Sequence, residues 1–215
     1  MCIDWEIKVW QNGEKMNAWK HFCTINNHKM LVMKDCFKVG LYKQGLLHDL
    51  SKYTPVEFLV GCKYYKGYMS PNNAERKDKG YSSAWLHHKG RNKHHMEYWI
   101  DYGLGDEKGE GKAMTGMKMP IRYVVEMFID RVGASKNYQG KDYKDDSALR
   151  YYEHGKDHYM LHPDTAALLE YMLVMLAVKG EKETYSYVKH KILKNKVPYK
   201  KRKLDALKDA LHVQM

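Results

Sequence analysis

Histidines and aspartates recur along this chain in an order that could bind a metal ion. His48 and Asp49 stand side by side after an apolar pair, and Lys52 follows three residues beyond Asp49. A second stretch, from His87 to His95, contains four histidines within nine residues. Imidazole together with carboxylate suits Mn, Fe, Co, Ni or Zn better than the all-oxygen ligand sets that Ca²⁺ and Mg²⁺ prefer. The sequence therefore predicts a site for one or two divalent transition-metal ions.

The candidate metal ligands are spread over more than one hundred residues. In chain order they are His28, His48, Asp49, His88, His94, His95 and Asp130. Adjacent imidazoles on one helix diverge by about 100°, so we expect His94 and His95 not to bind the same ion. Which of His87 and His88, and which of His94 and His95, are ligands stays open. We expect Glu97 to accept a hydrogen bond from a ligand histidine.

Asp49 and Lys52 are the candidate catalytic residues. Lys52 lies three residues after Asp49 and four after His48, so all three share one side if a helix continues through them. The ammonium group could then hold a phosphoryl oxygen and balance developing negative charge. Further candidates for substrate binding are Arg91, Asn92, Arg131 and Lys136.

The elements that position these residues are predicted to be helices, because apolar residues recur at intervals of three and four rather than two. We expect helices at about 15–38, through His48-Asp49, from Thr54 to about 66, over the histidine stretch, from Pro120 to about 136, and at about 164–178, 181–194 and 200–212. Side chains from separate helices could then converge within a bundle. No strand pattern is evident, and 67–80, 103–116 and 137–156 are expected to be loops or polar connections.

Local signals mark several of the expected helix boundaries. Thr54 is expected to cap a helix, with Glu57 completing a capping box. Ser82 or Ser83 is expected to cap the histidine-bearing segment. Gly90 and Asn92 are expected to interrupt that segment, which would change the directions of the histidines beyond the break.

The length of 215 residues fits one substantial domain with a helical appendage. We expect a helical metal-binding domain over 1–196 and an amphipathic basic helix over 197–215. No apolar run approaches the roughly 18 residues of a membrane span, and the N-terminus lacks the pattern of a signal peptide. Four cysteines without CxxC spacing favour reduced thiols in a cytoplasmic protein: Cys2, Cys23, Cys36 and Cys62. The oligomeric state stays open.

The formal net charge of +11 favours an anionic partner, although a lysine-rich surface that aids solubility would give the same value. A small phosphorylated substrate fits this charge. Nucleic acid is an alternative partner, but none of its recognition motifs is present.

The ordered set of histidines and aspartates resembles the HD-domain superfamily of metal-dependent phosphohydrolases. The resemblance rests on His28, His48-Asp49 with Lys52, His88, His94-His95 and Asp130. The stretch from about 24 to 138 is also similar to a family of short, uncharacterised bacterial and phage proteins, notably at 45–53, 63–67, 85–95 and 130–136.

The superfamily resemblance implies an all-α, HD-domain-like helical bundle with a C-terminal helical extension. It implies one ion held by His28, His48, Asp49 and Asp130, and a second held by His88 with His94 or His95. It also implies that Lys52 contacts phosphate. The interval between His88 and the His94-His95 pair is shorter than is usual in the superfamily. The glycine-tyrosine-proline element of its cyclic-dinucleotide branch is absent, so that substrate is not implied.

Three functions follow as expectations. The first is metal-dependent hydrolysis of a phosphomonoester or phosphodiester in a small nucleotide-like substrate. The second follows from the resemblance of the ligand set to HD-fold proteins that bind two irons and oxidise a C–H bond with O₂. The third is a non-enzymatic helical module that binds a metal, a nucleotide or another protein.

Overall fold

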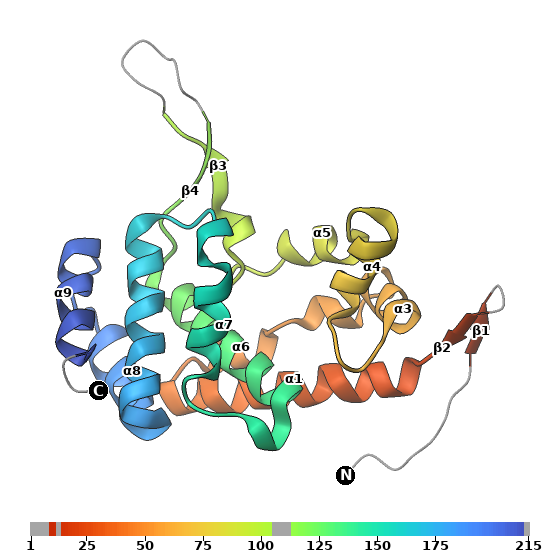
Figure 1. The fold of residues 1–215 in the computed structure, drawn as a ribbon, viewed down its shortest axis with the longest axis horizontal. Coiled ribbons are helices and arrows are strands. Elements are labelled where there is room, and N and C mark those ends of the chain that lie inside the picture. The colour runs from red at the N-terminus through yellow and green to blue at the C-terminus, as the bar shows by residue number, and fades with distance from the viewer. Residues whose placement is uncertain (1–8, 12–13, 105–112, 213–215) are drawn as a thin grey trace.

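The computed structural model describes residues 9–11, 14–104 and 113–212. Cys2 and residues 105–112 of the expected loop at 103–116 lie outside the described residues. The described part is mainly helical, as the apolar spacing predicts (Figure 1). Its α-helices are α1 (Ala18–Val39), α2 (Tyr42–Leu47), α3 (Pro55–Tyr64), α4 (Pro71–Lys79), α5 (Ser83–Lys89), α6 (Ile121–Gln139), α7 (Ser147–Gly155), α8 (Pro163–Tyr187) and α9 (Lys201–His212). Short 3₁₀ turns span Leu50–Tyr53, Met96–Trp99, Gly140–Asp142 and Lys156–His158, and a π turn spans Val188–Ile192.

Two small antiparallel hairpins correct the expectation that the chain contains no strands. β1 (Val9–Gln11) pairs with β2 (Glu14–Met16), and β3 (Ile100–Tyr102) pairs with β4 (Met114–Gly116). The second hairpin projects from the helical body at the top of Figure 1. Strands of three residues are too short to display the alternation by which a sequence pattern is recognised.

Two segments that were expected to be loops or polar connections contain helices. α4 lies within 67–80, and α7 lies within 137–156. Pro71 occupies the first turn of α4, where its missing N–H costs nothing, and Gly80 ends the helix in a left-handed conformation. Both helices are short and largely polar, so they lack the long apolar periodicity on which the prediction depended.

The core lies where α1, α6 and α8 pack together. Val32 of α1, Phe128 of α6 and Met172 of α8 are fully buried, and they belong to one apolar cluster. α9 packs against α8 and contributes the fully buried Leu204 to the same cluster. α1 runs beneath the other helices in Figure 1 and reaches the opposite end, where α3, α4 and α5 stand. α1 therefore connects the packed core to the end that carries the histidine-rich segment.

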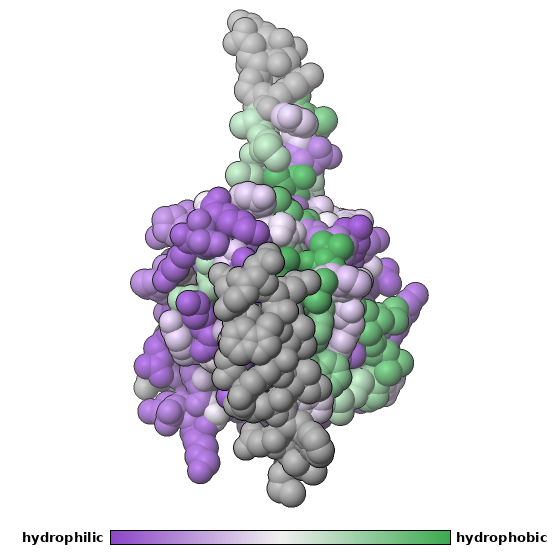
Figure 2. Space-filling model, turned by 90° about the vertical axis from the view of Figure 1, so that its right-hand side faces the viewer, coloured by the Kyte–Doolittle hydropathy of each residue, from purple (hydrophilic) through white to green (hydrophobic). Residues whose placement is uncertain are grey.

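Exposed apolar side chains gather on the elements that follow α1. They are Leu46, Leu47, Leu50, Val56 and Leu59. Figure 2 shows apolar surface on one flank of this end of the molecule and hydrophilic surface on the opposite flank. Among the described helices, none has both the length and the apolar character needed to span a bilayer.

Candidate metal centre

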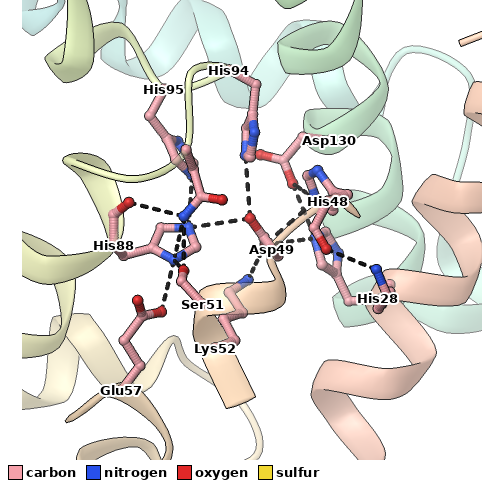
Figure 3. A network of polar contacts seen from close by, with 12 residues as sticks. His28, His48, Asp49, Ser51, Lys52, Glu57, His88, His94, His95 and Asp130 are labelled. Atoms are coloured by element: carbon pink, nitrogen blue, oxygen red, sulfur yellow. Dashed lines mark hydrogen bonds and ion pairs between the residues drawn. The ribbon is translucent and has the colours of Figure 1, made fainter. Parts of the chain in front are cut away.

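Every candidate ligand predicted from the sequence lies in one cluster, although the ligands come from five separate parts of the chain (Figure 3). α1 supplies His28, α5 supplies His88 and α6 supplies Asp130. The turn after α2 supplies His48 and Asp49, and the turn after α5 supplies His94 and His95. His28, His48, Asp49, His88 and His94 are each less than 9% exposed. The packing of α1 against α6 and of α3 against α5 brings these parts together.

Asp49 lies at the centre of the cluster, with each carboxylate oxygen facing different imidazoles. Its Oδ2 atom lies 3.8 Å from Nε2 of His28 and 3.4 Å from Nε2 of His48. Its Oδ1 atom lies 3.3 Å from Nε2 of His88 and 3.4 Å from Nε2 of His94. One carboxylate therefore stands between two sets of nitrogen atoms.

Two groups of side chains that share Asp49 could each hold a metal ion. In each group the ligand atoms lie within 4.8 Å of one another: His28, His48, Asp49 and Asp130 in one, and Asp49, His88, His94 and His95 in the other. Nitrogen and oxygen ligands lie about 2.0–2.2 Å from a transition-metal ion such as zinc, so ligands on opposite sides of one ion are about 4.4 Å apart or less. A third group of such atoms comprises His48, His94 and Glu126.

The expectation that His94 and His95 diverge is wrong, because neither residue is helical. α5 ends at Lys89, before Gly90 as predicted, and both histidines lie in the turn that follows. Their ring centroids are 4.1 Å apart, and Nε2 of His95 lies 2.9 Å from Nε2 of His88. The argument from helical geometry therefore does not apply. Both side chains offer a ligand atom to the group that also contains Asp49 and His88.

The backbone at His48-Asp49 also differs from the expected continuous helix. α2 ends at Leu47, and Asp49 takes a left-handed conformation with φ of 53°. Lys52 then lies on the 3₁₀ turn, where its Nζ atom is 2.6 Å from Oδ2 of Asp49. The lysine thus reaches the aspartate as predicted, but it does so through a turn instead of a helix face.

Two glutamates that the sequence analysis did not identify as site residues orient the imidazoles. Oε2 of Glu57 lies 2.8 Å from Nδ1 of His88. Oε1 of Glu126 lies 3.1 Å from Nδ1 of His48 and 3.2 Å from Nδ1 of His94. Because a carboxylate accepts hydrogen bonds, it favours the proton on Nδ1 and leaves the Nε2 lone pair directed at the centre.

The predicted capping box at Thr54 and Glu57 is wrong, because both side chains make other contacts. The hydroxyl of Thr54 donates to the carbonyl of Ser51 at 2.6 Å, and it makes no cap hydrogen bond to α3. Glu57 faces the histidines, where its Oε1 atom also lies 2.7 Å from Nδ1 of His87. Ser82, in contrast, caps α5 as predicted by accepting from the N–H of Trp85. Glu97 lines the neighbouring cavity.

The charges of the centre favour a cation. Burial alone would raise the pKa of Asp49, but His48, Lys52 and His88 outweigh burial and hold that pKa well below its usual value. Burial alone would lower the pKa of His94, but the nearby carboxylates of Asp49 and Glu126 outweigh burial and raise it to about 10. The negative charge that holds a proton on an imidazole would equally attract a metal ion, since both compete for the same lone pair.

Several converging atoms lack the hydrogen-bond partners that buried polar atoms normally have. They are Nε2 of His28, His48 and His94 and both carboxylate oxygens of Asp49. Their contacts are ion pairs with one another and with Asp130, His88 and Lys52. A buried polar atom without a partner costs about 1–3 kcal/mol. One ion in each of the two groups that share Asp49 would satisfy all five atoms, so this donor set fits transition-metal ions.

A cavity of about 710 Å³ opens onto the cluster. Its size falls within the range of about 300–1,000 Å³ that small-molecule sites occupy. Lys52, Asp130 and Arg131 line it, together with aromatic side chains that include Trp85 and Tyr138. The centre is therefore accessible to a molecule of moderate size.

Three of the predicted substrate-binding residues, Asn92 among them, do not line this cavity. Arg91 is exposed and donates to the carbonyl of His87 at 3.2 Å. Lys136 forms ion pairs with Asp35 on α1 and with Glu181 on α8. Neither belongs to the residues that line the cavity.

Asn92 stabilises the backbone around His88 through hydrogen bonds of its side chain. Its side-chain amide is buried and donates to Oγ of Ser51 at 2.8 Å and to the carbonyl of His88 at 2.9 Å. It holds the turn after α5 against the turn that carries Asp49. A ligand in the cavity would not reach it without displacing these bonds.

His21 lines the cavity although no motif indicated it. It lies seven residues before His28 on the same face of α1, and that spacing is the signal that could have identified it. Burial lowers its pKa to about 4, with a further contribution from Lys52. Its ring occupies the space left by Gly61, where a Cβ atom would lie 2.1 Å from Nε2.

Comparison with known proteins places the chain in a family and goes no further. Residues 17–175 match the family described as "Family of unknown function (DUF5662)", and no HD-domain family was matched. No curated protein and no solved structure matches the chain. The predicted similarity to an uncharacterised family is thereby confirmed over a longer stretch than expected. Because the match covers well over half of the sequence, the protein belongs to this family of unknown function.

Proposed function

We propose that this protein is an HD-domain-like, metal-dependent phosphohydrolase that acts on a small phosphorylated, nucleotide-like substrate. The observation that carries the proposal is the position of Asp49 between two sets of imidazoles, with the ammonium of Lys52 on the same carboxylate. Support also comes from the ordered motif and from the cavity that opens onto the cluster. The net charge of +11 favours an anionic substrate.

The two groups that share Asp49 are the proposed ligands of one or two ions. An ion held there would polarise a phosphoryl oxygen and lower the pKa of a coordinated water molecule to about 7. The chain's own contribution is to aim the ligand lone pairs. Glu126 does so for His48 and His94, and Glu57 does so for His88.

Lys52 is the proposed contact for the phosphoryl group. Its ammonium lies against Asp49, while 29% of its side chain remains exposed towards the cavity it lines. A phosphoryl group beside Asp49 would lie within reach of this ammonium. The positive charge would offset the negative charge that develops on the phosphoryl oxygens during hydrolysis.

The first experiment is elemental analysis of protein purified without a histidine tag and without chelator. We expect Mn, Fe, Co, Ni or Zn at one or two equivalents, and loss of the ion in His48→Ala and Asp49→Ala. His154→Ala is the matched control, because His154 is exposed on α7 and belongs to neither group. Folded protein that takes up no metal even after reconstitution would overturn the proposal.

Turnover is measured next on a panel of phosphomonoesters and phosphodiesters. We expect metal-dependent release of phosphate or alcohol from at least one nucleotide-like member. Lys52→Met should reduce this turnover while metal content is unchanged, because Lys52 is proposed to contact substrate. Tight metal binding with no turnover on the panel, but with retained nucleotide affinity, would instead favour a non-enzymatic binding module.

A di-iron oxygenase is the second candidate, because the shared carboxylate is compatible with it as well. One carboxylate between two groups of His and Asp ligands is also suited to holding two irons. Two equivalents of iron with a mixed-valent spectrum and O₂ consumption would select this candidate. One equivalent of another metal together with phosphate release would select the hydrolase.

A further inference from the structure

Arg131 lines the cavity in addition to Lys52, and unlike Lys52 it forms no ion pair with a carboxylate of the described residues. Arg131 follows Asp130 on α6 and lines the cavity. Among the described residues, no carboxylate forms an ion pair with its guanidinium group, whereas Arg150 on α7 pairs with Asp146 at 2.8 Å. The Nε atom of Arg131 is buried without a hydrogen-bond partner. An arginine that lines a cavity and forms no ion pair is available to an anionic ligand.

Aromatic side chains hold the guanidinium in place. It lies 4.9 Å from the ring centroid of Tyr159 and 5.6 Å from that of Tyr152. Its Nη1 atom donates a long hydrogen bond of 3.4 Å to the hydroxyl of Tyr159. The nearby carboxylate of Glu170 is already used by the hydroxyl of Tyr152 and by Lys208. The guanidinium is therefore held beside two rings by cation–π contacts and keeps N–H groups for a partner.

Arg131 lies at a different place in the cavity from Lys52. The ammonium of Lys52 contacts Asp49 in the middle of the cluster. The guanidinium of Arg131 lies against Tyr152 on α7 and Tyr159 beyond it, and neither tyrosine belongs to the groups around Asp49. One phosphoryl group at the metal centre would thus engage Lys52 and leave Arg131 for a second anionic group.

We infer that Arg131 forms a second anion subsite, so that the ligand of this cavity carries at least two anionic groups and not one. This inference rests on the proposed function for the first of these groups, and it narrows the substrate class to polyphosphorylated molecules. Arginine suits such a group because its fork of N–H donors binds two oxygens of a phosphate together.

The experiment is calorimetric titration of the metal-loaded protein with inorganic phosphate and with inorganic pyrophosphate. Metal content is measured after each titration, so that removal of the ion by pyrophosphate is not mistaken for binding. We expect pyrophosphate to bind at least about tenfold more tightly than phosphate, as charge-assisted hydrogen bonds predict. Arg131→Gln should abolish that ratio while phosphate affinity is unchanged, and Arg131→Lys should retain part of it.

Arg150→Gln is the matched control and should leave both affinities unchanged. A ratio close to one in the wild type, or a ratio that Arg131→Gln does not alter, would overturn the inference. If Arg131→Gln fails to retain metal, Arg131→Lys decides by the same ratio. Pyrophosphate binding that depends on Arg131 without hydrolysis of any phosphate ester would overturn the proposed function and leave this inference standing.

Discussion

At the scale of single residues, Asp49 combines a backbone role with a side-chain role. Its positive φ is a conformation that aspartate and asparagine adopt more readily than other residues with a side chain. This conformation turns the chain sharply between α2 and the following 3₁₀ turn, which presents both carboxylate oxygens to the imidazoles. The residue type is thus favoured by the turn and by the ligand geometry together.

Asp49→Asn separates these two roles. Asparagine tolerates the left-handed backbone, so we expect the variant to fold, but the free energy of unfolding of the metal-free protein should fall because the buried ion pair with Lys52 is lost. The amide lacks the negative charge and offers only one oxygen, so we expect bound metal to be lost. Elemental analysis beside chemical denaturation measures both quantities. An unaltered metal content would contradict the central position assigned to Asp49.

Glu126 also acts at this scale, through the protons that it holds on Nδ1 of His48 and His94. We expect Glu126→Gln to weaken metal binding about 10–100-fold, as removal of a carboxylate behind ligand histidines does elsewhere. Competition with a chromophoric chelator measures the affinity. Glu153→Gln, an exposed change on α7, is the control and should have no effect. Equal affinities in the two variants would show that Glu126 does not position the ligands.

At the scale of elements, the close packing of α1 on α6 positions His28 against Asp130. Nε2 of His28 lies 3.0 Å from Oδ1 of Asp130. Gly133 allows this approach, because a Cβ atom there would lie 2.7 Å from Cγ2 of Val32 on α1. A small residue on one helix thus determines the distance between ligands on two helices.

Gly133→Ala should therefore lower the free energy of unfolding by about 1–3 kcal/mol, because the added methyl group overpacks the contact. We expect the metal affinity to fall as well, since α1 must move away from α6. Gly90→Ala is the matched control, since the nearest atom to its Cβ would be 3.7 Å away. Urea unfolding compares the two variants, and equal stabilities would contradict the packing argument.

At the scale of the whole molecule, a buried ionic cluster joins the three core helices. Asp35 of α1 accepts from Lys38 on α1, from Lys136 on α6 and from the hydroxyl of Tyr185 on α8. Glu181 on α8 also pairs with both lysines. The cluster crosses the same packing interfaces as the apolar core and shares no residue with the proposed metal ligands.

This cluster predicts a loss of stability in acid. Burial alone would raise the pKa of Asp35, but the hydrogen bonds from Lys38 and Lys136 outweigh burial and hold the pKa below 3.8. A lowered pKa in the folded state contributes stability above the unfolded value and loses it as pH falls further. We expect Asp35→Asn to cost about 1.5–3 kcal/mol at neutral pH.

The difference in unfolding free energy between wild type and Asp35→Asn should be constant above pH 5 and shrink below about pH 4. Chemical denaturation across that pH range measures it. A difference that persists unchanged at pH 2.5 would show that the charge of Asp35 is not what stabilises the contact. Asp146→Asn, at an exposed pair with Arg150, is the control and should change stability by about 1 kcal/mol or less.

The sequence by itself determined that the molecule is mainly helical and which histidines and aspartates could bind a metal. Both are local properties, since apolar spacing reports on helix formation and residue type reports on ligand chemistry. The boundaries of α5 at Ser82 and of α6 at Pro120 were likewise predictable, because a cap or a proline acts on its own turn.

Only the tertiary structure decided how the two groups share Asp49 and which carboxylates hydrogen-bond to the ligand histidines. The turns at Asp49 and at His94-His95 depend on packing between helices, so helical geometry gave the wrong directions for these side chains. Glu57 and Glu126 bear no motif and act through contacts across 31 and 78 residues of chain. Such contacts are set by the packing of α3 on α5 and of α1 on α6, which bring distant residues together, and no local pattern of residues encodes them.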